Sequence, residues 1–256
     1  MNQVIRWVTY FLISVSTVTV LQFNRPIFSE TSTSDWGYQG KNGPEEWGEI
    51  TSEFSICKTG KQQSPVNLEK TASQAELPAI KFDYKYSAYE VVNDGSTIKV
   101  NYAPGSSISV AGKKYELLQF HFHTHSEHQI NGKTYPMEAH LVHQSSDGEL
   151  AVIGVLMKEG KANRFISSLW SNIPEKPGED QVIRGIQINA SALPPADQSY
   201  YNYSGSLTTP PCSEGVNWMV LKTPIEVSKQ QIKQFQSVYD VNARPVQPLN
   251  NRQVKN

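Results

Sequence analysis

The sequence predicts a β-rich α+β fold, built as a single domain on a largely antiparallel sheet. Short segments of alternating apolar and polar residues recur along the chain, and turn-forming residues separate them. Only two segments have the pattern of a helix. At 256 residues the chain is long enough to bury a substantial core, and no internal repeat or low-complexity tract indicates a second domain.

The expected strands lie between residues 97 and 222. In chain order they read TIKVNYA, SISVAG, KYELLQFHFH, EAHLVHQ, LAVIGVLMK, RGIQINAS and NWMVLK. Turn formers such as Asn93-Asp94-Gly95 and Asn131-Gly132 separate them. Segments 162–172 and 228–239 predict helices, the second with Ser228 as its N-cap. Residues 36–66 are rich in Gly, Trp and Pro, so we expect ordered but irregular chain there.

Composition excludes some classes of function. The hydrophobic content of 38% and charged content of 18% are typical of a globular protein. The net charge is −1 and no run of five like charges occurs. Nucleic-acid binding through a basic face therefore has no support.

The N-terminus has the pattern of an export signal. Arg6 precedes an uncharged apolar stretch at residues 7–21, which is shorter than the roughly 20 residues of a spanning helix. We expect residues 1–30 to be a signal peptide and linker, and residues 31–256 to be the folded domain. The alternative is an uncleaved anchor, which would be the chain's sole membrane contact. The sequence thus predicts a periplasmic or secreted protein.

The chain has two cysteines, Cys57 and Cys212. An even count in an exported protein suggests a disulfide that closes a long loop. Two buried free thiols are the alternative. No C-x-x-C occurs, which argues against a cysteine zinc site.

All six histidines lie between residues 121 and 143. If KYELLQFHFH is a strand, Gln119, His121 and His123 share one face, and Phe120 and Phe122 point the other way into a core. Two imidazoles two residues apart then point the same way.

The strand MEAHLVH would add a third imidazole to this face. Glu138 and His140 share one face of it. With Asn131-Gly132 at the centre of a two-residue hairpin, His123 would lie directly opposite His140, although Pro136 or a bulge in THSEH can shift this register.

Three neutral imidazoles with an open fourth position form a zinc site of the catalytic kind. Gln119 and Glu138 lie two residues before a histidine on the same face, where each can accept a hydrogen bond from the non-coordinating ring nitrogen. A core histidine cluster or a chance surface face is the alternative, and the polar partners favour the metal.

The motifs QFHFH, SEH, EAHLVH and SLTTPPC together resemble those of the α-class carbonic anhydrases. Further matches are WGYQG at 36–40, QSPVN at 63–67, YSGSLTTPPCSEGVNW at 203–218 and NARPVQPLNNR at 242–252, so the resemblance covers nearly all of the chain from residue 35. It implies a single domain around a large twisted, mostly antiparallel central β-sheet with a few short peripheral helices.

The resemblance also implies roles for individual residues. His121, His123 and His140 match the zinc ligands. Thr208 matches the hydroxyl that contacts zinc-bound hydroxide and donates to a carboxylate, which Glu127 matches. The residues that match the substrate site are Thr209 and an apolar wall for CO2 formed by Val142, Val152, Leu207, Val216 and Trp218. The cysteines match the disulfide pair of exported members, and His128 and His143 match structural histidines.

One departure from the family pattern concerns the proton. Ser96 stands where fast members carry a histidine that moves the proton out, and serine does not titrate near neutral pH. Turnover should therefore depend strongly on external buffer. His125 can replace that relay by its nearness to His123; an exposed loop histidine without a role, or an incidental contact, is the alternative.

The function that the resemblance implies is zinc-dependent, reversible hydration of carbon dioxide to bicarbonate and a proton by a zinc-bound hydroxide. The cofactor is Zn²⁺ and the partner is a small molecule, CO2 or bicarbonate. A catalytically silent binding domain of the same fold is the alternative, and the complete histidine set argues against it.

Overall fold

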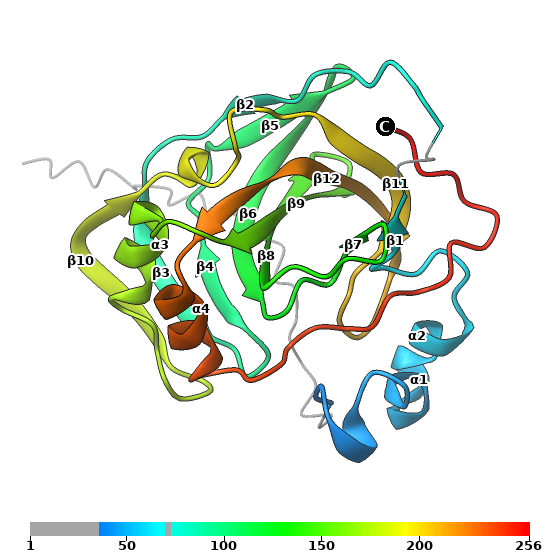
Figure 1. Ribbon diagram of the computed structural model, residues 1–256, viewed down its shortest axis with the longest axis horizontal. Coiled ribbons are helices and arrows are strands. Elements are labelled where there is room, and N and C mark those ends of the chain that lie inside the picture. Colours follow the sequence, from blue (N-terminus) through cyan, green and yellow to red (C-terminus); the bar gives the residue numbers. More distant parts are fainter. Residues whose placement is uncertain (1–35, 70–72) are drawn as a thin grey trace, which may run out of the picture. The chain divides into compact units, whose positions relative to one another are not determined.

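The computed structural model describes residues 36–69 and 73–256. A ten-stranded sheet forms its centre, with the strand order β10-β3-β4-β6-β8-β9-β12-β11 (Figure 1). Strand β5 also pairs with β6, and β2 pairs with β5. A second, two-stranded sheet joins β1 and β7. The strands are β1 (Asn67–Leu68), β2 (Lys81–Asp83), β3 (Ser87–Asn93), β4 (Ile98–Asn101), β5 (Ser107–Val110), β6 (Lys113–His123), β7 (Gln129–Ile130), β8 (Met137–Ser145), β9 (Leu150–Glu159), β10 (Asp180–Ile188), β11 (Tyr200–Ser206) and β12 (Glu214–Val227).

The large sheet is antiparallel except for the parallel pair of β9 and β12. This arrangement confirms the β-rich fold with one large, mostly antiparallel sheet. Each expected strand segment overlaps a strand of the structure, and sequence reasoning missed β1, β2, β3, β7 and β11.

Strands β6 and β8 lie in the middle of the sheet, and one face of each is buried in the core. Phe120, Phe122 and Leu141 are fully buried in the largest apolar cluster, which also contains residues of β3, β4, β9 and β12. The opposite face carries the histidines that alternate with them. The apolar side therefore fixes the direction in which the histidines point.

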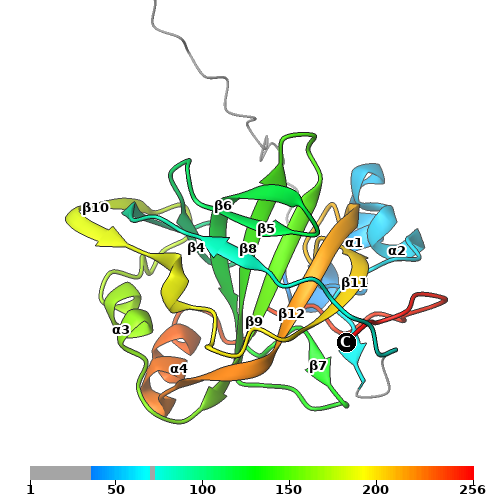
Figure 2. The same cartoon turned by 90° about the horizontal axis from the view of Figure 1, so that it is seen from above.

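The helices are short and lie outside the sheet. They are α1 (Trp47–Ile50), α2 (Ile56–Thr59), α3 (Arg164–Trp170) and α4 (Lys229–Gln236), with 3₁₀ turns at Gly40–Asn42, Ser52–Phe54 and Ala190–Ala192. The first two lie at one end of the sheet, and α3 and α4 lie toward β10 (Figures 1 and 2). Both expected helices are confirmed. Ser228 caps α4 as predicted, with its side chain bonded to the Gln231 N–H in a capping box.

The expected signal peptide, linker and possible anchor at residues 1–30 lie outside the described residues. Among those that are described, none of the helices has the length and apolar character needed to cross a bilayer.

Candidate active site

Strands β6 and β8 bring His121, His123 and His140 together. Their ligand nitrogen atoms lie within 4.8 Å of one another. The ring centroids of His123 and His140 are 4.5 Å apart, and that of His121 is 5.0 Å from His123 and 5.2 Å from His140. The predicted convergence of three imidazoles is therefore present.

The predicted register between the two strands is wrong. His140 lies opposite His121, and His123 lies opposite Glu138. Asn131-Gly132 does form a tight turn, since Ile130 and Lys133 exchange backbone hydrogen bonds of 3.0 and 3.1 Å. However, the Ser126 N–H bonds the Tyr135 carbonyl, so the chain takes four residues from 126 to 130 against two from 133 to 135. This is the bulge in THSEH, which shifts the register by two residues and keeps each histidine on the same face.

Each of the three rings is held at its second nitrogen. His121 Nδ1 is 2.9 Å from Gln119 Oε1, and His140 Nε2 is 3.0 Å from Glu138 Oε1, which are the two predicted contacts. His123 Nδ1 is 2.7 Å from the carbonyl oxygen of Asn242. Sequence reasoning missed this third contact, because the two residues are 119 positions apart.

Two observations indicate that the three histidines could hold a metal ion. His123 Nε2 is buried and has no hydrogen-bond partner, so it has a free lone pair inside the protein. Burial lowers the pKa of His121 and His140, and it lowers that of His123 to about 4. The imidazoles are consequently neutral near pH 7, as metal ligands must be.

A second group, His128 with Glu138 and His140, has metal-like spacing but is a hydrogen-bond network. His128 Nδ1 is 2.8 Å from Glu138 Oε1, and its Nε2 is 2.7 Å from Tyr203 Oη. Both ring nitrogens are thus occupied. Burial raises the pKa of Glu138, but the adjacent His128 and His140 outweigh burial and hold that pKa well below its usual value.

Glu127 faces the three histidines from the bulged segment. Its Oε2 lies 3.5 Å from His123 Nε2 and 3.7 Å from His140 Nδ1. Its Oε1 accepts a hydrogen bond of 2.8 Å from the Arg244 N–H. Burial raises the pKa of Glu127, and the adjacent His140, the Arg244 N–H and the Thr208 hydroxyl act in the opposite direction. Glu127 Oε2 is buried and has no hydrogen-bond partner.

An apolar cluster lies beside the histidines, on β8, β9 and β12. It contains the residues expected to form the CO2 wall, namely Val142, Val152, Leu207, Val216 and Trp218. Val142 and Leu207 are half-buried and the other three are buried. The Trp218 ring centroid is 4.8 Å from that of His140. Thr209 is half-buried in the loop after β11, where its carbonyl accepts the Cys212 N–H at 2.8 Å.

The two residues connected with proton transfer lie on different segments. Ser96 is half-buried before β4, and its hydroxyl donates to Asp94 Oδ1 at 2.7 Å. His125 is exposed, and its Nδ1 lies 2.8 Å from the Ser126 carbonyl oxygen. A relay role for His125 stays a prediction.

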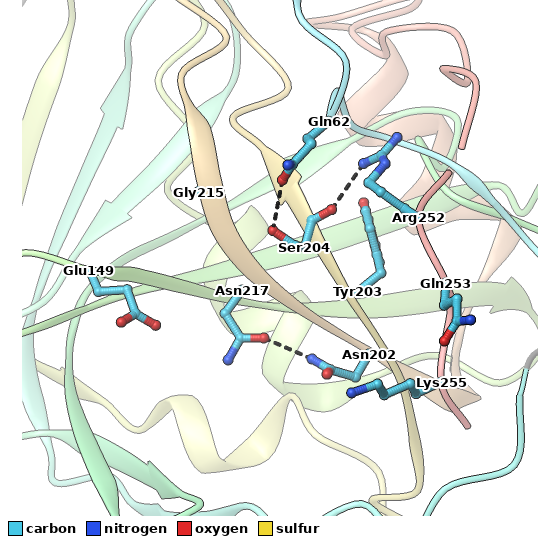
Figure 3. A pocket seen from close by; sticks show the side chains of 10 residues that line it. All are labelled: Gln62, Glu149, Asn202, Tyr203, Ser204, Gly215, Asn217, Arg252, Gln253 and Lys255. Carbon is cyan, nitrogen blue, oxygen red and sulfur yellow. Dashed lines mark hydrogen bonds between the residues drawn. The ribbon is translucent and has the colours of Figure 1, made fainter. Parts of the chain in front are cut away.

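Cys57 and Cys212 form a disulfide, which excludes the alternative of free thiols. The bond joins α2 to the loop that carries Thr208. Away from the histidines, a polar pocket lies between β11, β12 and the C-terminal segment, with Asn202, Asn217 and Arg252 in its lining (Figure 3).

Residues 42–256 match the family model described as eukaryotic-type carbonic anhydrase. The chain belongs to this carbonic anhydrase family. It is 46% identical over 230 residues to a carbonic anhydrase of Nostoc sp., covering 88% of this chain and 87% of that protein. It is 48% identical over 221 residues to one of Neisseria gonorrhoeae, covering 86% of each.

A solved structure supports the same assignment. The α-carbonic anhydrase of Thermovibrio ammonificans, determined with the inhibitor sulfanilamide, superposes with a TM-score of 0.85 at 45% identity. The match covers 88% of this chain and all of that one. The resemblance inferred from the motifs is confirmed, and the carbonic anhydrase fold provides the sheet that holds the three histidines.

Proposed function

We propose that this protein is an exported zinc enzyme that interconverts carbon dioxide and bicarbonate. The observation that carries the proposal is the convergence of three neutral imidazoles, one with an unpartnered buried nitrogen, beside a carboxylate and an apolar cluster. His121 Nε2, His123 Nε2 and His140 Nδ1 are the atoms that would hold the zinc ion, since the other ring nitrogens are bonded to Gln119, Asn242 and Glu138. Imidazole ligands also favour zinc over calcium or magnesium.

When bound, zinc supplies a Lewis acid that makes hydroxide available near neutral pH, a behaviour known chiefly from carbonic anhydrases themselves. Glu127 and Thr208 orient the reacting oxygen. An ionised carboxylate can only accept hydrogen bonds, so Glu127 requires the Thr208 hydroxyl to point its proton toward the carboxylate. The Thr208 oxygen then presents its lone pairs to the reaction centre. This fixes the direction of attack at no further cost in entropy.

The apolar cluster holds the second reactant. Carbon dioxide has no net charge or dipole, so a wall of Val142, Val152, Leu207, Val216 and Trp218 can hold it weakly and exclude water. Thr209, at the rim, adds a polar group where bicarbonate would form. A catalytically silent binding domain would not require three converging ring nitrogens. Their convergence and the family match therefore favour the enzyme over this alternative.

The N-terminal segment completes the proposal. Residues 1–30 act as a signal peptide and linker, or as an uncleaved anchor, and deliver residues 31–256 to the periplasm or the exterior. The long-range disulfide supports export, because such bonds persist in oxidising compartments. The mass of the mature protein and its distribution between membrane and soluble fractions distinguish cleavage from anchoring.

The decisive test is stopped-flow CO2 hydration with metal quantified on the same sample. We expect about one zinc per chain, as the single histidine triad requires, and hydration that rises steeply with buffer concentration because Ser96 cannot relay a proton. Full zinc loading without hydration would overturn the enzyme proposal. Hydration that is fast in dilute buffer would keep the enzyme but remove the argument from Ser96.

A further inference from the structure

We infer that Arg244 is a positioning residue, whose buried guanidinium fixes the backbone N–H that holds Glu127 toward the three histidines. The inference rests on the proposed carbonic anhydrase activity. It adds a residue from NARPVQPLNNR, a segment for which the motif alone gives no role.

The Arg244 side chain is almost completely enclosed, with 1% of its surface exposed. Nη1 donates to Gln63 Oε1 at 2.9 Å and to the Ser64 carbonyl at 2.8 Å, and Nη2 donates to the Cys57 carbonyl at 2.8 Å. The guanidinium carbon lies 5.6 Å from the centre of the Trp47 ring. Contacts in three directions leave the side chain, and hence its own backbone, little freedom to move.

The other end of this arrangement is the carboxylate. The Arg244 N–H holds Glu127 Oε1 at 2.8 Å, while Glu127 Oε2 has no hydrogen bond of its own and faces His123 and His140. A carboxylate is rigid, so a shift of Oε1 turns Oε2 by a similar amount. The position of the Arg244 backbone therefore sets where Glu127 presents its free oxygen.

The same side chain also connects to the Thr208 loop. Gln63, which accepts from Arg244, donates through Nε2 to the Cys212 carbonyl at 3.0 Å. Cys57, whose carbonyl accepts from Arg244, is bonded to Cys212. Arg244 thus connects the segment that carries Glu127 to the loop that carries Thr208. The proposed mechanism requires a constant distance between these two segments.

Lysine cannot replace this arginine. The guanidinium reaches three acceptors on two sides of a planar fork, whereas an ammonium is a single point with a shorter reach. Arg244→Lys should consequently resemble Arg244→Met rather than restore activity.

Arg252 provides a matched control. Its guanidinium also donates to three carbonyl groups, those of Ser204, Pro248 and Leu249, and lies 5.7 Å from the centre of the Tyr203 ring. Figure 3 shows it beside Ser204, among the side chains that line the polar pocket. Arg252 is half-buried and makes the same kinds of contact as Arg244 to different residues, and no hydrogen bond joins it to Glu127.

The experiment is a double-mutant cycle on the zinc-loaded enzyme. It combines Arg244→Met, Arg244→Lys and Glu127→Gln, singly and paired, with Arg252→Met as control. In concentrated buffer, where proton transfer does not limit turnover, we expect each Arg244 variant to lower kcat by about 10- to 100-fold, because a small misplacement of an orienting group has that effect, with KM for CO2 nearly unchanged. In the Glu127→Gln background, the same Arg244 changes should have almost no further effect on kcat. Arg252→Met should lower Tm without lowering kcat.

A second readout does not depend on activity. In ¹H–¹⁵N spectra of the metal-free protein, the backbone amide proton of residue 244 should move upfield in Glu127→Gln, where its acceptor loses the charge, and in Arg244→Lys, where the hydrogen bond to the carboxylate weakens. If the Arg244 variants fail to fold, Gln63→Leu removes one of the three acceptors and should give a smaller fall in kcat that again vanishes with Glu127→Gln.

The outcomes separate the two proposals. Wild-type protein without CO2 hydration refutes the proposed function and leaves the amide shift as the test of Arg244. If the wild-type protein is active, two outcomes refute the positioning role. In the first, the Arg244 variants have a lower Tm but an unchanged kcat. In the second, the loss of kcat in the Arg244 variants adds to the loss in Glu127→Gln.

Discussion

Two parts of one site are built in different ways. His121, His123 and His140 stand on β6 and β8, in the middle of the sheet, where the ladder and the apolar face beneath fix each side chain. Glu127 and Thr208 lie on segments between strands. Arg244 holds Glu127, and Gln63 and Cys57 hold the Thr208 loop through Cys212, in each case from more than a hundred residues away. In the proposed mechanism, metal binding therefore depends on the sheet, and orientation of the reactants depends on long-range contacts. Perturbations should separate the two.

Removal of one ligand tests the sheet part and should have the largest effect. We expect His121→Ala to lose bound zinc and to reduce hydration to the uncatalysed background, since two imidazoles leave the metal site incomplete. Metal analysis and stopped flow measure this. His143→Gln is the matched control, because His143 lies on the same sheet but on the apolar face and should keep its zinc.

Removal of the disulfide tests the segments between strands that carry Glu127 and Thr208. The bond spans 155 residues, so a Cys57→Ser, Cys212→Ser double variant should lose about 5 kcal/mol of unfolding free energy by the loop-entropy model. Urea unfolding measures the loss. Zinc content at low temperature should stay at the wild-type level. Loss of zinc in the folded variant would show that the two parts are not independent.

A buried histidine gives the sheet part a pH dependence. Burial lowers the pKa of His143 from 6.5 to about 3, so the folded state keeps it neutral. Its contribution to stability is complete above pH 6.5 and declines as the pH falls toward 3. Between pH 7 and pH 4, protonation of this histidine in the unfolded state should lower the free energy of unfolding by about 3 kcal/mol. The free energy of unfolding should therefore fall by about 3 kcal/mol more for wild type than for His143→Gln between pH 7 and pH 4. An equal fall in the two proteins would contradict this prediction.

A change at Thr208 should separate orientation from metal binding. Thr208→Val keeps the volume but removes the hydroxyl, and we expect kcat to fall by about 100-fold with full zinc content, as for the loss of one orienting group. Thr223→Val is the control, because Thr223 is a surface threonine whose hydroxyl donates to Asp197. Zinc loss in the Thr208 variant would place this residue in the metal-binding part.

The smallest expected effect concerns His125. If it relays protons, His125→Ala lowers turnover a few-fold in dilute buffer and not in concentrated imidazole, since an external base replaces the relay. Equal turnover of variant and wild type in dilute buffer would remove His125 from the mechanism. Ser96→His serves as the positive control and should make turnover less dependent on buffer.

The difference between the two parts also explains what could be predicted from the sequence. Alternation along QFHFH and EAHLVH is a local property, so it placed the three histidines with Gln119 and Glu138 on one face. The register was wrong because backbone N–H groups of Glu127 and His128 bond Glu138 Oε2 instead of continuing the ladder. Those contacts depend on the folded structure.

The contacts of Asn242 and Arg244 had no local signal at all. Neither lies in an alternating segment, and their partners are 117 to 187 positions away. The motif NARPVQPLNNR marked the segment only through its resemblance to a family. Disulfide pairing, by contrast, was open to prediction from the count of two cysteines.

The two faces of β6 carry different groups, and this has a consequence for the substitutions that the protein tolerates. Phe120 and Phe122 fill the core on one side, and His121 and His123 belong to the candidate site on the other. We therefore expect each position from 120 to 123 to tolerate few substitutions. Edge strand β10 is different, because most of its residues are exposed. A saturation mutagenesis scan should find β6 nearly closed to substitution and β10 permissive, which makes β10 the place to accept new sequence without disturbing the chemistry.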